Sequence, residues 1–196
     1  MTTELKTFHT ASASQVKTWR GCNRKWWFDK ILGLGQPTSD AMDFGTKVHA
    51  QLEDYVNGKI EVGQMMPEAV ELLQYLPQNH HLITEQKLTI PKGDGWPVQV
   101  TGLIDLLAQD KESPELIHVI DYKTTGNFAY VPEREVVKAD PQRVIYTAMV
   151  LHFEKKAEYV TFELLYTLKT YNRTEPQSRR VSVSTKRGDS DFRQVL

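Results

Sequence analysis

The spacing of apolar residues changes along this 196-residue chain, and the change restricts the folds open to it. Up to about residue 77 apolar side chains recur at helical spacing, whereas beyond it they mainly follow the pattern of strands. The order of helix, three strands, helix and strand predicts an α/β (α+β) fold in which helices flank a central mixed sheet. The predicted helices are 12–33, 40–56, 67–76 and 140–156, and the predicted strands are 82–90, 98–109, 116–122, 159–169 and a weaker 180–185.

Local signals place the starts of the first and third predicted helices. Ser12 followed by Gln15 is a capping-box pattern, and Gly21 is the candidate break point in the helix that it opens. Pro67 suits the first position of a helix, because its fixed φ fits the helix and its missing N–H is not needed there. The N-terminal part is therefore expected to be helical before the sheet begins.

Size and composition favour one globular domain in a reducing compartment. At this length roughly 70% of the unfolded chain's surface can be buried. Cys22 is the one cysteine, which excludes an internal disulfide, and no apolar run suits a signal peptide or a membrane span. We expect a cytoplasmic protein with a single domain over 1–196, helical over 1–77 and sheet-rich over 78–196. Residues 190–196 look like the opening turns of a helix, which leaves two alternatives, a truncated C-terminus or an unusually short protein.

Charge is unevenly distributed along the chain. The formal net charge is −1, which excludes a uniformly basic surface. Residues 17–30 hold five cations against one acid, and residues 169–193 hold seven against three. Arg20, Arg24 and Lys25 in the first patch are candidate phosphate-binding residues, or they cover an aromatic cluster with their stems. Core packing is the expected role for most of that cluster: Trp19, Trp26, Trp27 and Phe28.

Asp105 lies in a predicted strand that leaves little room for water. Leu103 and Leu107 are expected to share its face, and the alternate positions are apolar too. A buried carboxylate without compensation costs several kcal/mol or more, so it must be paired, hydrogen-bonded or bound to a metal. For a lone aspartate, a salt bridge to a core lysine or arginine is the favoured interpretation.

The next predicted strand repeats this feature. Asp121 and Lys123 share one face, because side chains two positions apart point the same way and lie about 7 Å apart. Asp105 and Asp121 can converge on one divalent cation if the strand is central, with Lys123 close enough to contact a water or a phosphate oxygen. Oxygen ligands favour Mg²⁺ or Mn²⁺ over soft metals. A solvated ion pair at a strand end is the alternative for Asp121 and Lys123 alone.

Two predicted helices add polar side chains beside their apolar stripes. His49 lies one turn from Glu53, and a satisfied boundary residue is as good an interpretation of this histidine as a ligand. Gln142 and Tyr146 are four positions apart and therefore project together. They form either the rim of a helix or a pair that orders the Lys123 loop or contacts a phosphate.

Together these residues resemble the PD-(D/E)XK nuclease superfamily, and within it the RecB-like exonuclease branch. That branch includes nuclease domains of helicase–nucleases, CRISPR-associated RecB-like nucleases and many phage nucleases. The resemblance covers most of the chain, and its segments occur in the expected order. They are Ser12-Ala13-Ser14-Gln15 with the residues on to Gly33, Gly45-Thr46-Lys47-Val48-His49, Glu85, Gly102-Leu103-Ile104-Asp105, Asp121-Tyr122-Lys123-Thr124-Thr125 and Gln142-x-x-x-Tyr146.

This resemblance implies a restriction-endonuclease-like core that hydrolyses phosphodiester bonds with Mg²⁺ or Mn²⁺. The implied metal ligands are His49, Asp105, Asp121 and the carbonyl of Tyr122. Asp105, Asp121 and Lys123 are the implied catalytic residues, and Lys123 would orient or activate the attacking water and stabilise charge on the phosphate. Glu85, Gln142 and Tyr146 are the implied supporting residues, with Glu85 as an outer or second-metal carboxylate.

The chain departs from many of these relatives in its cysteines. They carry four cysteines for an iron–sulfur cluster, the first at the position of Cys22, and often a proline where this chain has Asn23. With one cysteine we expect no cluster. The sequence also lacks a Gly-x-x-x-x-Gly-Lys-Ser/Thr phosphate loop, so a helicase motor would have to be a partner protein.

The leading hypothesis is a divalent-metal-dependent deoxyribonuclease. We expect an exonuclease rather than a site-specific endonuclease, acting on DNA ends in recombination, repair or phage DNA processing, with Arg20, Arg24 and Lys25 binding DNA. The alternative is a catalytically silent DNA-binding or assembly module of a larger helicase–nuclease complex. Such silent relatives usually lack a ligand or the lysine, and this chain has all of them.

Overall fold

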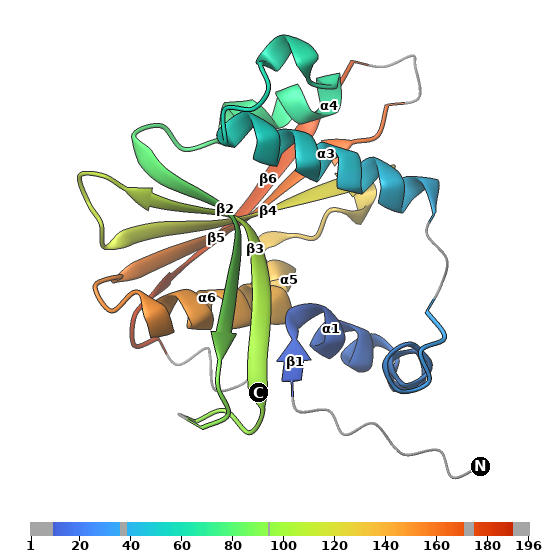
Figure 1. Cartoon of the computed structure of the whole chain (residues 1–196), viewed down its shortest axis with the longest axis vertical. Coiled ribbons are helices and arrows are strands. Elements are labelled where there is room, and N and C mark those ends of the chain that lie inside the picture. Colours follow the sequence, from blue (N-terminus) through green and yellow to red (C-terminus); the bar gives the residue numbers. More distant parts are fainter. Residues whose placement is uncertain (1–9, 36–38, 94, 171–174, 190–196) are drawn as a thin grey trace.

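A six-stranded mixed sheet lies at the centre of the described chain, with helices on both of its faces (Figure 1). The computed structural model describes residues 10–35, 39–93, 95–170 and 175–189. This arrangement confirms the predicted mixed α/β fold. The strands are β1 Thr10–Ser12, β2 His80–Ile90, β3 Gln99–Asp110, β4 Leu116–Thr125, β5 Tyr159–Leu168 and β6 Ser178–Lys186. The α-helices are α1 Ala13–Gly21, α2 Asn23–Trp26, α3 Asp40–Val56, α4 Pro67–Val70, α5 Arg134–Lys138 and α6 Pro141–Phe153.

β3 is the branching strand of the sheet. It pairs antiparallel with β2 along nearly its whole length, but with β4 only over residues 106–109. Further back, over residues 99–101, the same edge of β3 pairs in parallel with β1. β4 pairs in parallel with β5, and β5 pairs antiparallel with β6. A fork therefore opens between β3 and β4 on the N-terminal side of Leu106.

The predicted helix starts are confirmed. Ser12 caps α1 by accepting the Gln15 backbone N–H at 3.3 Å, and the extended backbone of Cys22 ends this helix after Gly21. α2 and a π-helical turn, η1 Trp27–Ile31, follow in place of one continuous helix. α4 begins with Pro67 at its first position. The remaining short helices are of the 3-10 type: η2 Val62–Gln64, η3 Glu71–Tyr75 and η4 Phe128–Tyr130.

Two short elements were not predicted, because each has too few residues to show a periodic pattern of apolar side chains. β1 has 3 residues and is held by its pairing with β3. α5 has 5 residues and buries Val137 in the core. The predicted helix start at residues 190–196 lies outside the described residues.

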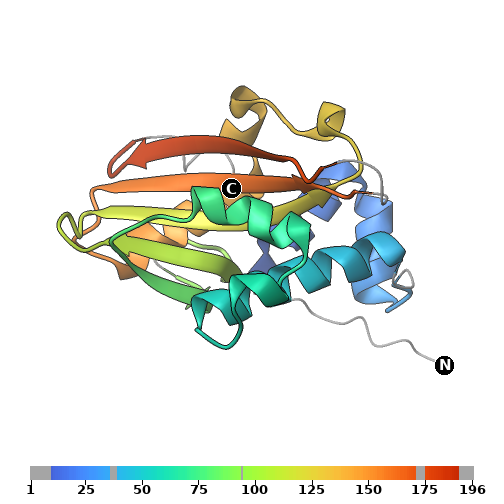
Figure 2. The same ribbon diagram turned by 90° about the horizontal axis from the view of Figure 1, so that it is seen from above.

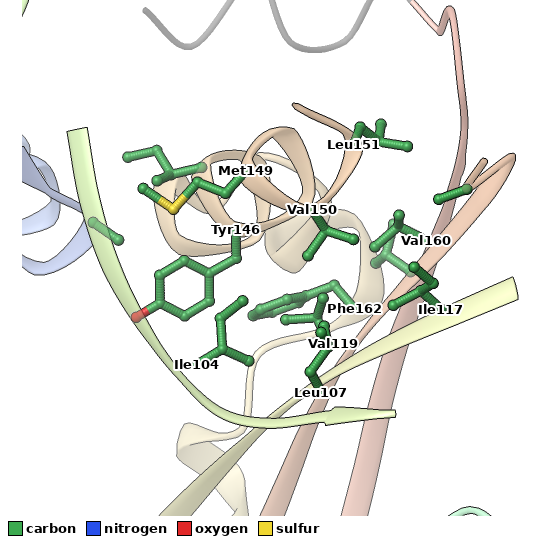
Figure 3. Packing of buried hydrophobic residues seen from close by; sticks show 14 of the residues in the cluster. Ile104, Leu107, Ile117, Val119, Tyr146, Met149, Val150, Leu151, Val160 and Phe162 are labelled. Carbon is green, nitrogen blue, oxygen red and sulfur yellow. The ribbon is translucent and has the colours of Figure 1, made fainter. Parts of the chain in front are cut away.

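Two hydrophobic cores occupy the two faces of the sheet. α3 and α4 cover one face, and α6 covers the other with α1 and α5 beside it (Figures 1 and 2). Val48 and Leu52 of α3 are fully buried in the first core. Tyr146 and Met149 of α6 pack in the second core with Phe162 of β5 (Figure 3). None of the described helices combines the length and the apolar character needed to cross a membrane.

At Glu85 and Asp105, the side chains of β2 and β3 stop alternating regularly between the two faces of the sheet. Ile104 and Leu107 both point into the α6 core (Figure 3), whereas Leu106 belongs to the α3 core, so simple alternation fails between them. The β2–β3 ladder pairs Thr84 with Leu106 and Gln86 with Ile104 but skips Glu85 and Asp105 between them, and Glu85 has a φ of +49°. A positive φ is rare for a residue with a side chain and marks a locally strained backbone.

This break in the alternation shows that the predicted face of Asp105 was wrong. Leu103 is 47% exposed and Leu107 is buried beneath α6, so these two leucines and Asp105 do not form one row. The prediction was wrong because it assumed an uninterrupted strand. The distortion lets the Asp105 carboxylate reach the fork between β3 and β4.

Candidate active site

Asp105 fills the fork where β3 separates from β4. Its Oδ2 accepts the backbone N–H of Tyr122 at 2.9 Å, replacing the ladder hydrogen bond that β3 no longer offers. The same oxygen lies 3.3 Å from Nδ1 of His49 on α3. The favoured interpretation of Asp105 as paired with a core lysine or arginine is therefore wrong: its partners are a histidine and a backbone amide.

Asp121 is the most deeply placed acid of the site. Its residue is 3% exposed, and its Oδ1 accepts a hydrogen bond from Nε2 of Gln142 at 2.5 Å. Its Oδ2 forms an ion pair with the Lys123 ammonium but has no hydrogen-bond partner of ordinary geometry. Burial raises the pKa of Asp121, the charge of Lys123 opposes this, and the charge of Asp105 adds to it. A positive charge beside this carboxylate is needed to keep it ionised.

Lys123 supplies that charge and also reaches solvent. Its side chain is 32% exposed. Burial disfavours its ammonium form, but the charge and hydrogen bond of Asp121, with a contribution from Asp105, outweigh burial and raise the pKa of Lys123. The solvated strand-end pair considered from the sequence is therefore wrong, because the carboxylate is buried. The lysine is a fixed cation at the mouth of the site.

His49 joins the site because α3 lies close against β4. A Cβ added at Gly45 would lie 3.2 Å from Oγ1 of Thr124, so glycine permits this close approach. The His49 ring meets the Tyr122 ring edge to face, with centroids 5.6 Å apart. Burial disfavours the imidazolium, but the hydrogen bond and charge of Asp105 outweigh burial and raise the pKa of His49.

The expected supporting residues also lie at the fork. Glu85 lies across the β2–β3 ladder from Asp105, and burial and the charge of Asp105 raise the pKa of this carboxyl. Gln142 holds Asp121 from the start of α6. Tyr146, one turn later, lies against Gly102, where an added Cβ would come within 2.8 Å of its ring. The fork thus gathers side chains from both faces of the sheet.

Sequence reasoning included Gly102 in a matching segment without assigning it a role, and it missed Tyr166. The need for Gly102 is set by the packing of Tyr146 on β3, for which the only signal was a glycine three residues before Asp105. Tyr166 is the β5 neighbour of Lys123 in the β4–β5 register. No sequence pattern marks Tyr166, because its place depends on which strand pairs with β4 and in what register.

The N-terminal cations and aromatics lie outside this fork-centred set. Arg20, Arg24 and Lys25 are all exposed. Trp19 is 55% exposed, and Trp27 is 42% exposed. The expectation that most of the aromatic cluster packs in the core was wrong, because no residue of α2 or the following π-helical turn is buried. Exposed aromatic rings beside exposed cations are a surface suited to nucleic acid.

The second basic segment is not one positive patch. Arg180 is bound to the buried carboxylate of Glu163 at 2.6 Å. Arg187 donates to three backbone carbonyls, those of Ala157, Leu151 and Glu154. The predicted patch at 169–193 is therefore wrong as a unit over its described part, since two of its cations serve the fold.

The donor set at the fork fits a hard divalent cation. Two carboxylates, one imidazole and the Tyr122 carbonyl form an oxygen-rich donor set, and the buried Asp121 Oδ2 already has a cation, the Lys123 ammonium, as its partner. Over the described ranges no three histidine, cysteine or acidic side chains gather closely enough to hold a metal ion by themselves. In this arrangement Lys123 neutralises Asp121 and His49 lies against Asp105.

The mixed sheet with helices on both faces is a restriction-endonuclease-like scaffold, and a comparison with family models assigns the chain to a nuclease superfamily. The chain belongs to the PD-(D/E)XK nuclease superfamily, whose family model matches residues 10–82 and 61–196. Among solved structures, the crystal structure of SSO0001 is similar with a TM-score of 0.54 and 19% identity, over 91% of this chain and 69% of that one. This similarity supports the restriction-endonuclease-like fold. No curated protein matches the chain.

Proposed function

We propose that this chain is a Mg²⁺- or Mn²⁺-dependent deoxyribonuclease of the RecB-like branch that degrades DNA from its ends. Membership of the nuclease superfamily supports hydrolysis of phosphodiester bonds. The observation that carries the proposal is the buried Asp121 carboxylate, held by Gln142 and Lys123 across the fork from Asp105. Burying an acid in this way costs stability, so the arrangement points to chemistry rather than to folding.

The cation would be held by His49, Asp105, Asp121 and the carbonyl of Tyr122. When bound, such an ion lowers the pKa of a water molecule and neutralises charge on the phosphate. The chain's own residues set the environment. Gln142 occupies one Asp121 oxygen and Lys123 pairs with the other, so a bound cation would share that second oxygen with the lysine or replace the lysine there. Glu85 adds a third carboxyl beside Asp105.

Lys123 carries the proposed catalytic charge. The charge of Asp121 raises its pKa, and as a cation Lys123 would orient or activate the attacking water and stabilise charge on the phosphate. Tyr146 sits one helical turn beyond Gln142 and supports the same side of the fork. The reacting phosphate would approach Lys123 from its solvent-exposed side.

DNA binding is proposed for the exposed cations of the first helices, Arg20, Arg24 and Lys25. They lie beside exposed aromatic rings on which unpaired bases can stack. A single nuclease domain over residues 1–196 would then carry both the strand-binding surface and the chemistry. Recombination, repair or phage DNA processing in a bacterial cell is the proposed setting, with a helicase as the proposed partner protein.

Digestion of end-labelled linear DNA and of circular DNA tests the proposal. Cleavage of the linear substrate in Mg²⁺ or Mn²⁺, with none in EDTA and little on the circle, is the expected result. Asp121→Asn keeps the shape of the side chain and should lose cleavage. Wild-type protein that binds DNA but cleaves neither substrate with either metal would favour the silent-module alternative instead.

A further inference from the structure

A row of three side chains crosses the sheet from the proposed catalytic lysine to its far edge. The β4–β5 register pairs Lys123 with Tyr166, and the β5–β6 register pairs Tyr166 with Arg179. Side chains that are direct cross-strand partners lie on one face, with Cβ atoms about 5 Å apart. Lys123, Tyr166 and Arg179 are thus successive positions on one surface.

Phe128 anchors the outer end of this row. It follows β4 in the turn η4, and the Arg179 guanidinium carbon lies 4.6 Å from the centre of its ring. A ring face at that distance orients the guanidinium plane without neutralising its charge. Arg179 is therefore positioned and still able to bind an anion.

The neighbouring residue shows why Arg179 differs from an ordinary structural arginine. Arg180 points to the opposite face and is bound to the buried Glu163 at 2.6 Å. Arg179 is exposed and, within the described residues, forms no ion pair with an acid. Arg180 therefore stabilises the fold, whereas the charge of Arg179 faces solvent.

Tyr166 lies between the two cations in the strand register. Partial burial raises its pKa, the charge of Lys123 opposes this, and Asp121 and Asp140 add to it, so the phenol stays protonated at neutral pH. A neutral phenol can donate a hydrogen bond to a phosphate oxygen. The row therefore offers a cation, a neutral donor and a second cation in sequence.

We propose that Arg179 and Tyr166 form a subsite for the sugar–phosphate backbone of the substrate strand, in which Arg179 binds the phosphate next to the one beside Lys123. Phe128 is the positioning residue for the guanidinium. This inference rests on the proposed nuclease function and extends it, since it assigns the direction in which the strand leaves the catalytic centre: across β5 toward the β6 edge.

Binding of a short fluorescein-labelled single-stranded oligodeoxynucleotide, followed by anisotropy in EDTA over a series of NaCl concentrations, tests the subsite without cleavage. Arg179→Ala should weaken binding about tenfold, the effect of one charge-assisted hydrogen bond. It should also flatten the log–log salt slope by about 0.7, as expected for one lost phosphate contact on a single strand. Arg179→Lys keeps the charge and should keep the slope, with intermediate affinity.

Lys186→Ala is the matched control. Lys186 ends the same strand, β6, and also lies over an aromatic ring, that of Tyr159, at 5.8 Å. It pairs with the start of β5, far from Lys123, so its removal should change neither affinity nor slope beyond the general effect of one surface charge. Equal behaviour of Arg179→Ala and Lys186→Ala would overturn the proposal.

Cleavage in Mn²⁺ separates this inference from the proposed function. If the wild type cleaves and Arg179→Ala raises KM with kcat nearly unchanged, both stand. If the wild type cleaves and Arg179→Ala matches it in affinity and KM, the subsite is wrong and the nuclease stands. If binding depends on Arg179 but nothing is cleaved, the strand subsite stands and the proposed chemistry is wrong. A wild type that neither binds nor cleaves refutes both.

Discussion

Gly102→Ala is the perturbation whose effect can be worked most directly from the packing. A Cβ at this position would lie 2.8 Å from Cε1 of Tyr146 and 2.9 Å from Sδ of Met149. Methionine can rotate away, but the Tyr146 ring packs against Phe162, with ring centroids 6.5 Å apart. We therefore expect overpacking that costs about 1–3 kcal/mol and lowers the Tm by about 2–4 °C per kcal/mol for a chain of this size.

The same substitution should reach the active site. A displaced Tyr146 shifts the α6 turn that carries Gln142, and Gln142 holds Asp121. We expect cleavage in Mn²⁺ to fall at temperatures where the variant is still folded. Urea unfolding and cleavage of end-labelled DNA, measured on the same preparation, separate the two effects.

Two further variants make this test sharp. Gly63→Ala is the control, because nothing lies within 4 Å of the Cβ that it would add. Gly102→Ala combined with Met149→Ala removes one of the two clashing groups, so the double variant should lose less stability than the sum of the single losses. Gly102→Ala with the stability of the wild type would refute the packing argument.

Three other predictions follow from the site and the surface. Lys123→Ala should reduce cleavage by about 10²- to 10⁴-fold, and it should lower the Tm in EDTA because the buried Asp121 loses its counter-charge; an active variant would remove the lysine from the mechanism. The triple variant R20A/R24A/K25A should flatten the salt slope of duplex binding by about 0.9 per lost phosphate contact; an unchanged slope would exclude this surface. The raised pKa of His49 stabilises the metal-free fold below the pKa of the unfolded chain, and this contribution is lost as pH rises through the folded-state pKa, so the Tm advantage over His49→Ala in EDTA should shrink with rising pH. In Mn²⁺ the trend should reverse, because imidazole binds a metal in its neutral form, and parallel pH profiles with and without metal would contradict the assignment.

Much of the fold could be predicted because its long elements carry clear patterns. α3 begins and ends at the predicted residues 40 and 56, because its apolar stripe is strong and Ser39 caps it. The long strands of the core were predicted because their apolar residues also form clear patterns. β1 and α5 could not be predicted, since contacts with the rest of the fold stabilise them and their own residues carry no clear pattern.

The residues that gather at the fork could be predicted from the sequence, but their geometry could not. Asp121 and Lys123 lie as strand periodicity requires, two positions apart on one face. Asp105 does not follow this periodicity, because the alternation of side chains breaks beside Glu85. No residue pattern indicates the positive φ of Glu85. The subsite at Arg179 depends on the pairing of β4, β5 and β6, which the sequence leaves open.

The central claim is that the fork between β3 and β4 holds a divalent cation, and calorimetric titration of Mn²⁺ tests it most directly. The wild type should bind Mn²⁺, and its thermal stability should rise with the logarithm of the ratio of free Mn²⁺ to Kd once that ratio exceeds one. Asp105→Asn should weaken binding, because this residue faces the fork and its partners, His49 and the Tyr122 amide, remain in place. Binding that is absent in the wild type, or unchanged in Asp105→Asn, would contradict the account.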